Sequence, residues 1–125
     1  MSTAPNAPQA WHSFWTQFGL PVYDENTVPE TAAANRITYT YAEAEFESPV
    51  ALSASLWYKS QSWEDISLMA SLIYETIGLG GILVPYDTGK LWIKRGSPFS
   101  QRMSDEDEKY RRIYLNLEVE FLTYK

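Results

Sequence analysis

Histidine is the side chain best suited to moving protons near neutral pH, and this chain has one, His12. A Ser-His-Asp triad or a histidine-ligated zinc site would have to be built on it. His12 lies beside an apolar helical stripe, where a structural role is the ordinary one. We therefore predict that the chain has no catalytic residue and is not an enzyme.

A run of four acidic residues, Asp105 to Glu108, has the ligand type that a hard cation such as calcium prefers. The run lacks the glycine turn and the alternate ligand spacing of an EF-hand loop. Nearby basic residues balance its charge: Arg102, Lys109, Arg111 and Arg112. We therefore predict no metal site, and a nearly neutral charged segment that folds back on itself or lies against a neighbour.

Glycines and tryptophans are the remaining candidates for ligand chemistry. Gly78, Gly80 and Gly81 follow a helical pattern instead of opening one, and no phosphate-loop lysine comes after them. We therefore predict no nucleotide site and no cofactor. Packing in the core or at an interface is favoured for three tryptophans that could otherwise line a pocket: Trp57, Trp63 and Trp92.

The first element that could position these residues is a short amphipathic helix over residues 11–18. Its apolar side chains recur at i, i+3, i+4 and i+7. Pro8 suits the first turn, and Gly19 followed by Pro21 ends the helix. We expect residues 1–10 to form a flexible N-terminal segment and residues 11–125 to form a single domain. The stripe consists of Trp11, Phe14, Trp15 and Phe18.

A second helix is predicted from about Ser62 to Gly78. Ser62 and Asp65 resemble a capping box, in which a hydroxyl and a carboxylate satisfy free amides at the helix start. Leu68 and Leu72 lie well away from the main apolar arc, so this second stripe requires a partner within the fold or on another chain. The main arc consists of Ile66, Met69, Ala70, Ile73 and Ile77.

Five stretches alternate apolar and polar residues with the period of a strand. They suggest an α+β fold, in which an antiparallel or mixed sheet of about five strands has two main helices packed on one face. Residues 20–35 and 96–109 show no period, and we interpret both as long irregular segments. A connection as long as residues 20–35 is either functional or contains a further element of secondary structure. The predicted strands cover residues 36–42, 50–58, 82–86, 91–95 and 113–121.

Composition narrows the function classes further. The 125 residues include 16 acidic and 10 basic side chains, for a net charge of −6, which disfavours tight binding of nucleic acid. There is no cysteine, so disulfides and thiol chemistry are excluded, and we predict neither a membrane span nor a secretory signal. The 19 aromatic residues exceed what one small core easily absorbs, which points to an interaction protein.

Several short strings, taken in order and with the total length, resemble tail terminator proteins of long, flexible-tailed bacteriophages. The resemblance covers most of the chain from Trp11 onward. It rests on Phe18 to Tyr23 with Val28-Pro29, on Pro49 to Leu52 with Leu56 to Tyr58, and on Leu91 to Phe99 with Gln101 to Met103.

This resemblance implies a structural virion protein that forms a hexameric ring on the head-proximal end of the tail tube. Such a ring stops tube growth and joins the tail to a neck protein of the head. The implied partners are other copies of the chain, the tail tube protein and the head-completion protein, while DNA passes through the lumen without specific binding. The implied location is the virion, with assembly in the host cytoplasm.

We expect the ring and its partners to be contacted through both irregular segments, 20–35 and 96–109, with the outer stripe of the second helix as a second patch. Aromatic, arginine and methionine side chains, which are enriched at interfaces, occur together in residues 96–109. Two alternatives remain: a head-closure or neck adaptor that binds the portal side first, and a small ligand-binding or hydrolytic domain that would need His12. The candidate interface residues are Phe99, Gln101, Arg102, Met103, Leu68, Leu72 and Trp92.

Overall fold

The computed structural model describes residues 4–45, 48–104 and 107–123, which form two helices and a six-stranded sheet. The α+β class is confirmed, with one strand more than the sequence predicts. In chain order the elements are α1 (Ala7–Thr16), β1 (Val22–Asp24), a 3-10 turn (Glu25–Thr27), β2 (Arg36–Tyr39), β3 (Val50–Lys59), α2 (Glu64–Ile77), β4 (Ile82–Tyr86), β5 (Gly89–Met103) and β6 (Tyr110–Thr123).

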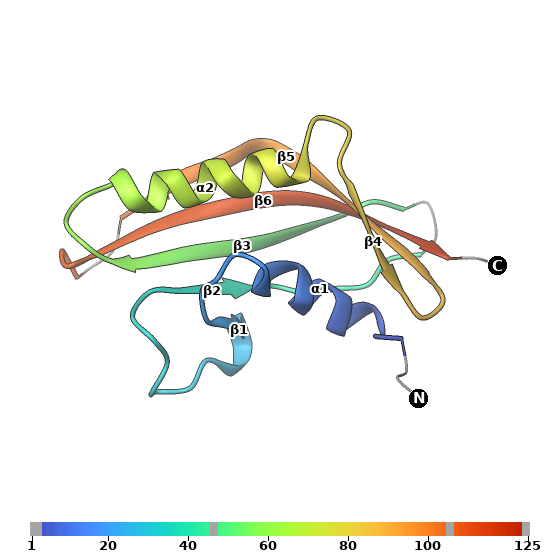
Figure 1. Cartoon of the computed structure of the whole chain (residues 1–125), viewed down its shortest axis with the longest axis horizontal. Coiled ribbons are helices and arrows are strands. Elements are labelled where there is room, and N and C mark those ends of the chain that lie inside the picture. The colour runs from blue at the N-terminus through green and yellow to red at the C-terminus, as the bar shows by residue number, and fades with distance from the viewer. Residues whose placement is uncertain (1–3, 46–47, 105–106, 124–125) are drawn as a thin grey trace.

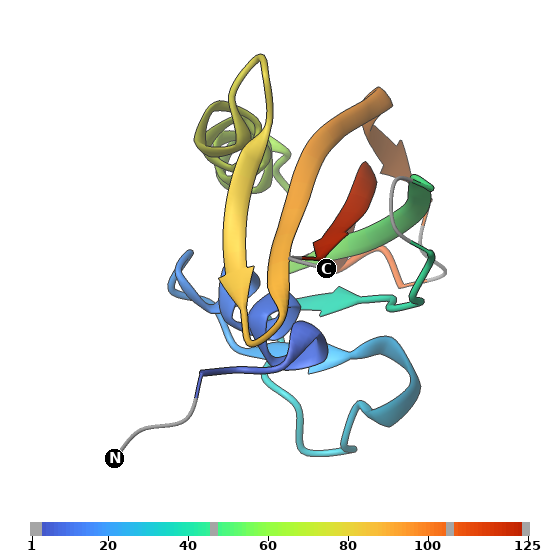
Figure 2. The same ribbon diagram turned by 90° about the vertical axis from the view of Figure 1, so that its right-hand side faces the viewer.

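The sheet is mixed and strongly curved. Its strand order is β1-β2-β3-β6-β5-β4, and every pair is antiparallel except β1 with β2. The sheet curls so far that α1 contacts both edge strands, β1 and β4 (Figure 2). Both helices lie on the concave face, with α2 crossing β3, β6 and β5 (Figure 1). The predicted placement of both helices on one face is therefore confirmed.

Apolar and polar residues alternate along β3 and β6, so the apolar side chains lie on one face of the sheet and the polar side chains on the other. Leu52, Ala54 and Leu56 on β3 pair with Leu117, Leu115 and Ile113 on β6, and all six side chains are buried on the concave face. The intervening residues point to the convex face, which no helix covers (Figure 1). A shift of one residue would expose the whole core, so this register is strongly specified.

Helix α1 begins earlier than its aromatic stripe suggests. The Asn6 side chain accepts from the Gln9 amide at 2.9 Å, and the Gln9 side chain accepts from the Asn6 amide at 2.9 Å, which is a complete capping box. Residues 7–10, which the sequence analysis assigns to the flexible segment, therefore form the first turn, and Ala7 and Ala10 are buried.

The capping box predicted for α2 is wrong. The N-cap is Trp63, which makes no side-chain capping bond, so Asp65 falls one residue too early to reach back as a capping-box acid. The Ser62 hydroxyl instead accepts from the Glu64 amide at 3.1 Å. The predicted end is confirmed, because Gly78 adopts a positive φ of 77° directly after the last helical residue.

The structure shows that the interpretation of residues 20–35 and 96–109 as irregular is wrong in part, because both contribute to the sheet. Residues 20–35 contain the short strand β1, and β5 continues through residues 96–103 to Met103. The pairing of β5 with β6 shifts register between Arg95 and Ser100, so Gly96 and Pro98 mark a bulge and not a strand end. At Gly96 a Cβ would lie 2.7 Å from the Asn116 carbonyl oxygen, which explains the glycine.

Candidate protein-interaction surface

Helix α2 presents a bare apolar stripe to solvent. Ile66, Ala70 and Ile73 are buried against the sheet, whereas Leu68 and Leu72 are 64% and 50% exposed. Two exposed leucines one helical turn apart lie on the same face, where they form a continuous apolar strip. The exposure expected for this stripe from the sequence is confirmed.

Beside this stripe lies a groove between α2 and the second half of β5. It holds a cavity of about 420 Å³ and an adjoining cavity of about 360 Å³, and Ser67, Ser71 and Arg102 line both. The small serine side chains keep the groove open along one edge of the helix. Its other lining residues are Ala70, Tyr74, Phe99, Ser100 and Ile113 in the first cavity and Trp63, Glu64 and Leu68 in the second.

An arginine stacked on a tryptophan forms one end of the groove. The Arg102 guanidinium lies 4.8 Å from the centroid of the Trp63 ring, and Arg111 lies 5.4 Å from the same ring. Arg111 is anchored, since it donates to the Gln61 carbonyl at 2.7 Å and to the Glu108 carbonyl at 3.0 Å. Arg102 is exposed, and no carboxylate of the described residues lies within 4.0 Å of it. It is therefore available to an acidic group on a partner.

A second stacked group closes the opposite end. The Tyr74 and Phe99 rings pack edge to face with centroids 5.3 Å apart. The Arg95 guanidinium lies 3.3 Å from the Tyr74 ring centroid, and its Nε donates to the Tyr74 carbonyl at 3.0 Å. The same carbonyl accepts from the Gly78 amide at 3.2 Å, so Arg95 adds a second bond at the end of α2. The groove thus has an aromatic end at Tyr74 and a cationic end at Arg102.

The structure brings three of the predicted interface residues together at this groove, namely Leu68, Phe99 and Arg102, and Leu72 lies on the exposed stripe beside it. Gln101 points to the other face of β5, where its side-chain oxygen accepts from Asn116 at 3.1 Å. Met103 is 37% exposed at the end of β5. The lining residues not expected from the sequence are Glu64, Ser67, Ser71, Tyr74 and Ser100, and Arg95 adjoins them through the Tyr74 ring. The available signal was the pair of small residues Ser67 and Ser71, spaced i and i+4 beside the leucine stripe.

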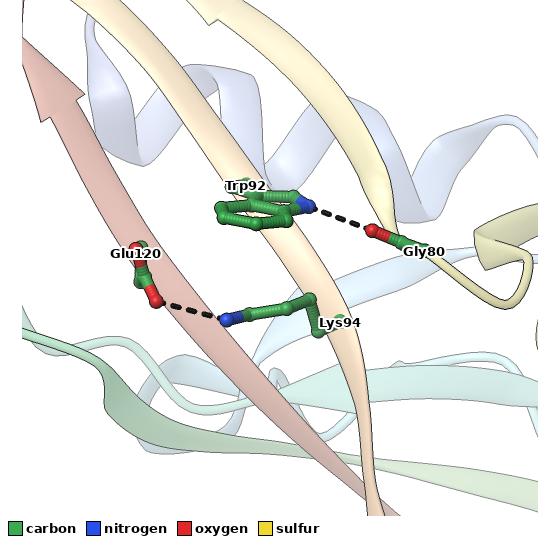
Figure 3. Close-up of polar contacts among 4 residues, drawn as sticks. All are labelled: Gly80, Trp92, Lys94 and Glu120. Atoms are coloured by element: carbon green, nitrogen blue, oxygen red, sulfur yellow. Dashed lines mark hydrogen bonds and ion pairs between the residues drawn. The ribbon is translucent and has the colours of Figure 1, made fainter. Parts of the chain in front are cut away.

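Trp92 lies apart from the groove, on the convex face. Its Nε1 donates to the Gly80 carbonyl at 2.9 Å, and the Lys94 ammonium lies 4.3 Å from the ring centroid and 2.8 Å from Glu120 (Figure 3). Trp92 also borders an apolar hollow of about 370 Å³ together with Leu83 and Leu122.

His12 of α1 packs against Tyr39 of β2. Its Nδ1 lies 2.9 Å from the Tyr39 hydroxyl, and the two rings pack edge to face.

The described residues contain no group of three or more histidine or acidic side chains placed to hold a metal. Asp105 and Glu106 of the acidic run lie outside the described residues. Within the same residues no helix is both long and apolar enough to cross a bilayer.

Comparisons with known proteins reveal the fold and no sequence family. No protein-family model matches the chain, and no curated protein matches it. A chain from the virion of a native gene transfer agent (GTA) particle superposes with a TM-score of 0.58 at 18% identity, over 86% of this chain and 83% of that chain. A second solved chain superposes with a TM-score of 0.61 at 11% identity, over 94% of this chain and 91% of its own. The chain therefore shares its fold with a chain of the gene transfer agent virion.

Proposed function

We propose that this chain is a structural protein of a phage-like virion, and that it forms a ring on the head-proximal end of the tail tube. The observation that carries the proposal is the shared fold with a chain of the gene transfer agent virion, over most of both chains. The order of short strings that resembles tail terminators points to the same position in the particle. The ring ends tube growth and joins the tail to the neck of the head.

The groove beside α2 supplies the contact with the tube. A tube subunit that covers Leu68 and Leu72 removes two half-exposed leucines from water, which stabilises the complex without any change in the fold. Arg102 on Trp63 provides the type of anchor that dominates interface energetics. A carboxylate on the tube end pairs with Arg102 and fixes the orientation of the ring.

The test is to mix the purified protein with growing tail tubes and to measure tube lengths by electron microscopy. We expect tubes capped at a fixed length with the wild-type chain. Leu72→Ser and Arg102→Glu each abolish capping, because they remove the apolar strip and the cationic end of the groove. Leu79→Ser is the matched control, since Leu79 is 96% exposed but lies outside the groove and should leave capping intact.

Tubes that keep growing in the presence of the wild-type protein contradict the proposal. Binding to isolated head or neck components without any effect on tubes instead identifies the chain as a head-closure or neck adaptor.

A further inference from the structure

A row of two arginines and one tryptophan crosses the uncovered convex face of the sheet. Arg36 on β2 and Arg112 on β6 are both register partners of Trp57 on β3, so the three side chains share one face. The guanidinium carbons lie 5.2 Å and 4.6 Å from the centroid of the Trp57 ring. We call these three residues the arginine row.

Hydrogen bonds hold this row in place, and Arg36 donates through Nη1 to the Ala33 carbonyl at 3.1 Å. The Trp57 Nε1 donates to the Thr38 hydroxyl at 2.9 Å, while Arg112 donates through Nε and Nη2 to the Ser55 hydroxyl at 3.2 Å and 3.1 Å. Thr38 and Ser55 are buried beneath these larger side chains. The arginine row is therefore an ordered surface, and an incoming group would bind it with little loss of side-chain entropy.

Among the residues that the structure describes, no ion pair neutralises the charge of the arginine row. No carboxylate of the described residues lies within 4.0 Å of Arg36 or Arg112; the ion pair among those residues is that of Lys94 with Glu120, on the same face but toward the opposite end of the strands. Two guanidiniums beside one indole ring, in a chain with a net charge of −6, attract a carboxylate or another anion.

Two exposed carboxylates lie at the opposite end of the molecule from the arginine row. Glu43 and Glu45 are exposed on the connection that precedes β3, and the Tyr41 hydroxyl donates to Glu43 at 2.9 Å. Tyr41 itself packs edge to face against Phe121, which fixes the segment to the end of β6. Trp57 lies about 23 Å along β3 from Val50, so residues 43–45 and the arginine row of one chain lie at opposite ends of the sheet (Figure 1).

We propose that the arginine row binds residues 43–45 of a second copy of this chain. The contact is head to tail, with the arginine row of one subunit on Glu43 and Glu45 of the next, and repetition of such a contact through a fixed rotation closes a ring. This inference rests on the proposed ring-forming function and deepens it by naming the surface between ring neighbours. The groove beside α2 stays free for the tube.

Nucleic acid fits the arginine row less well than a second copy does. Glu118 and Glu120 lie on the same convex face, and the excess of acidic residues in the chain opposes the approach of a phosphate backbone. A short acidic segment, in contrast, presents carboxylates that guanidinium groups bind in a bidentate manner.

The experiment uses two neutralised variants of the full chain, Arg36→Gln/Arg112→Gln and Glu43→Gln/Glu45→Gln, with masses measured by analytical ultracentrifugation. Each variant alone should remain at 14.4 kDa under conditions in which the wild type forms rings. Mixed in equal amounts, they should stop at a 1:1 dimer, because each supplies the half of the contact that the other lacks. Lys90→Gln, which removes one positive charge near the other end of β5, is the matched control and should form rings.

Thermal unfolding of each variant verifies that a monomer is folded, and Arg36→Lys/Arg112→Lys, which keeps the charge, should restore partial association. Rings from both neutralised variants at wild-type concentrations overturn the head-to-tail contact and leave the ring function standing. Loss of duplex DNA binding in Arg36→Gln/Arg112→Gln, with rings unchanged, also overturns it in favour of a phosphate site. A wild-type chain that is monomeric alone and on tail tubes overturns the proposed function itself.

Discussion

The two helices lie on the same face of one sheet, yet they bury their apolar residues to very different extents. In α1 the rings of Trp11, Phe14 and Trp15 are all buried, because the curled sheet encloses this helix between its two edge strands. In α2 only one side is packed, and Leu68 and Leu72 remain exposed. The difference teaches that α1 is an internal part of the core, whereas α2 covers the sheet with one side and leaves an apolar stripe on the other, which we propose contacts partners.

The largest effect is expected from truncating the centre of α1. Trp15→Ala should lower the free energy of unfolding by about 3–5 kcal/mol, since it removes a fully buried indole from contact with Trp11, Phe14 and Phe18. Urea denaturation followed by circular dichroism measures the loss. Trp15→Phe is the control: the buried indole N–H has no hydrogen-bond partner among the described residues, so its removal leaves no orphaned acceptor. An equally stable Trp15→Ala variant would refute the comparison.

Truncation to alanine on the two sides of α2 should distinguish the side that packs in the core from the side that is exposed. Ile73→Ala is expected to cost about 2–5 kcal/mol of unfolding free energy, because Ile73 is fully buried. Leu72→Ala is expected to change stability by about 0.5 kcal/mol or less, as is usual for an exposed position. Chemical denaturation of both variants checks this contrast, and a large loss for Leu72→Ala would mean that the outer stripe belongs to the fold.

The N-terminal caps of the two helices should contribute differently to the free energy of unfolding. Asn6→Ala removes a complete capping box from α1 and is expected to cost about 1 kcal/mol in the free energy of unfolding. Ser62→Ala at the start of α2 should cost less, since Ser62 accepts one amide bond from outside the N-cap position. Thermal unfolding of the two variants ranks them, and the reverse order would contradict the assignment of the caps.

The smallest effect concerns two tyrosines beneath the helices and appears only at alkaline pH. Burial, aided by the Asp24 carboxylate, raises the pKa of Tyr39, and burial, aided by Asp65, raises the pKa of Tyr58. Because the unfolded chain ionises first, near pH 10, stability is complete below that value and falls as the pH rises through the folded-state pKa. Stability measured against pH for Tyr58→Phe should show a shallower fall than for the wild type. An unchanged profile would indicate that Tyr58 does not titrate differently on folding.

Much of the fold follows from local periodicity. The aromatic stripe of α1, the buried arc of α2 and the alternation in β3 and β6 are all visible in the sequence, because each element repeats its apolar residues with its own geometry. The outer stripe of Leu68 and Leu72 is visible for the same reason. Pro8 indicates the first turn of α1, but residues 7–10 carry no aromatic stripe that would extend the predicted helix over them.

The groove was predicted only in part, because half of it depends on β5. Gly96 and Pro98 interrupt the local strand pattern, and nothing within that segment indicates that pairing with β6 resumes at Ser100. Propensity at such a bulge is overridden by the neighbouring strand. The placement of Arg102 over Trp63 and of Phe99 against Tyr74 depends on that resumed register.

Residue order alone specified the two amphipathic helices, most of the strands and a leucine stripe too apolar for solvent, since these properties depend on side chains a few positions apart. Tertiary structure decided the rest: the curl that encloses α1, the groove that joins α2 to β5, and the row formed by Arg36, Trp57 and Arg112. Each of these arises from residues distant in sequence, and their contacts are set by strand register and not by any local pattern.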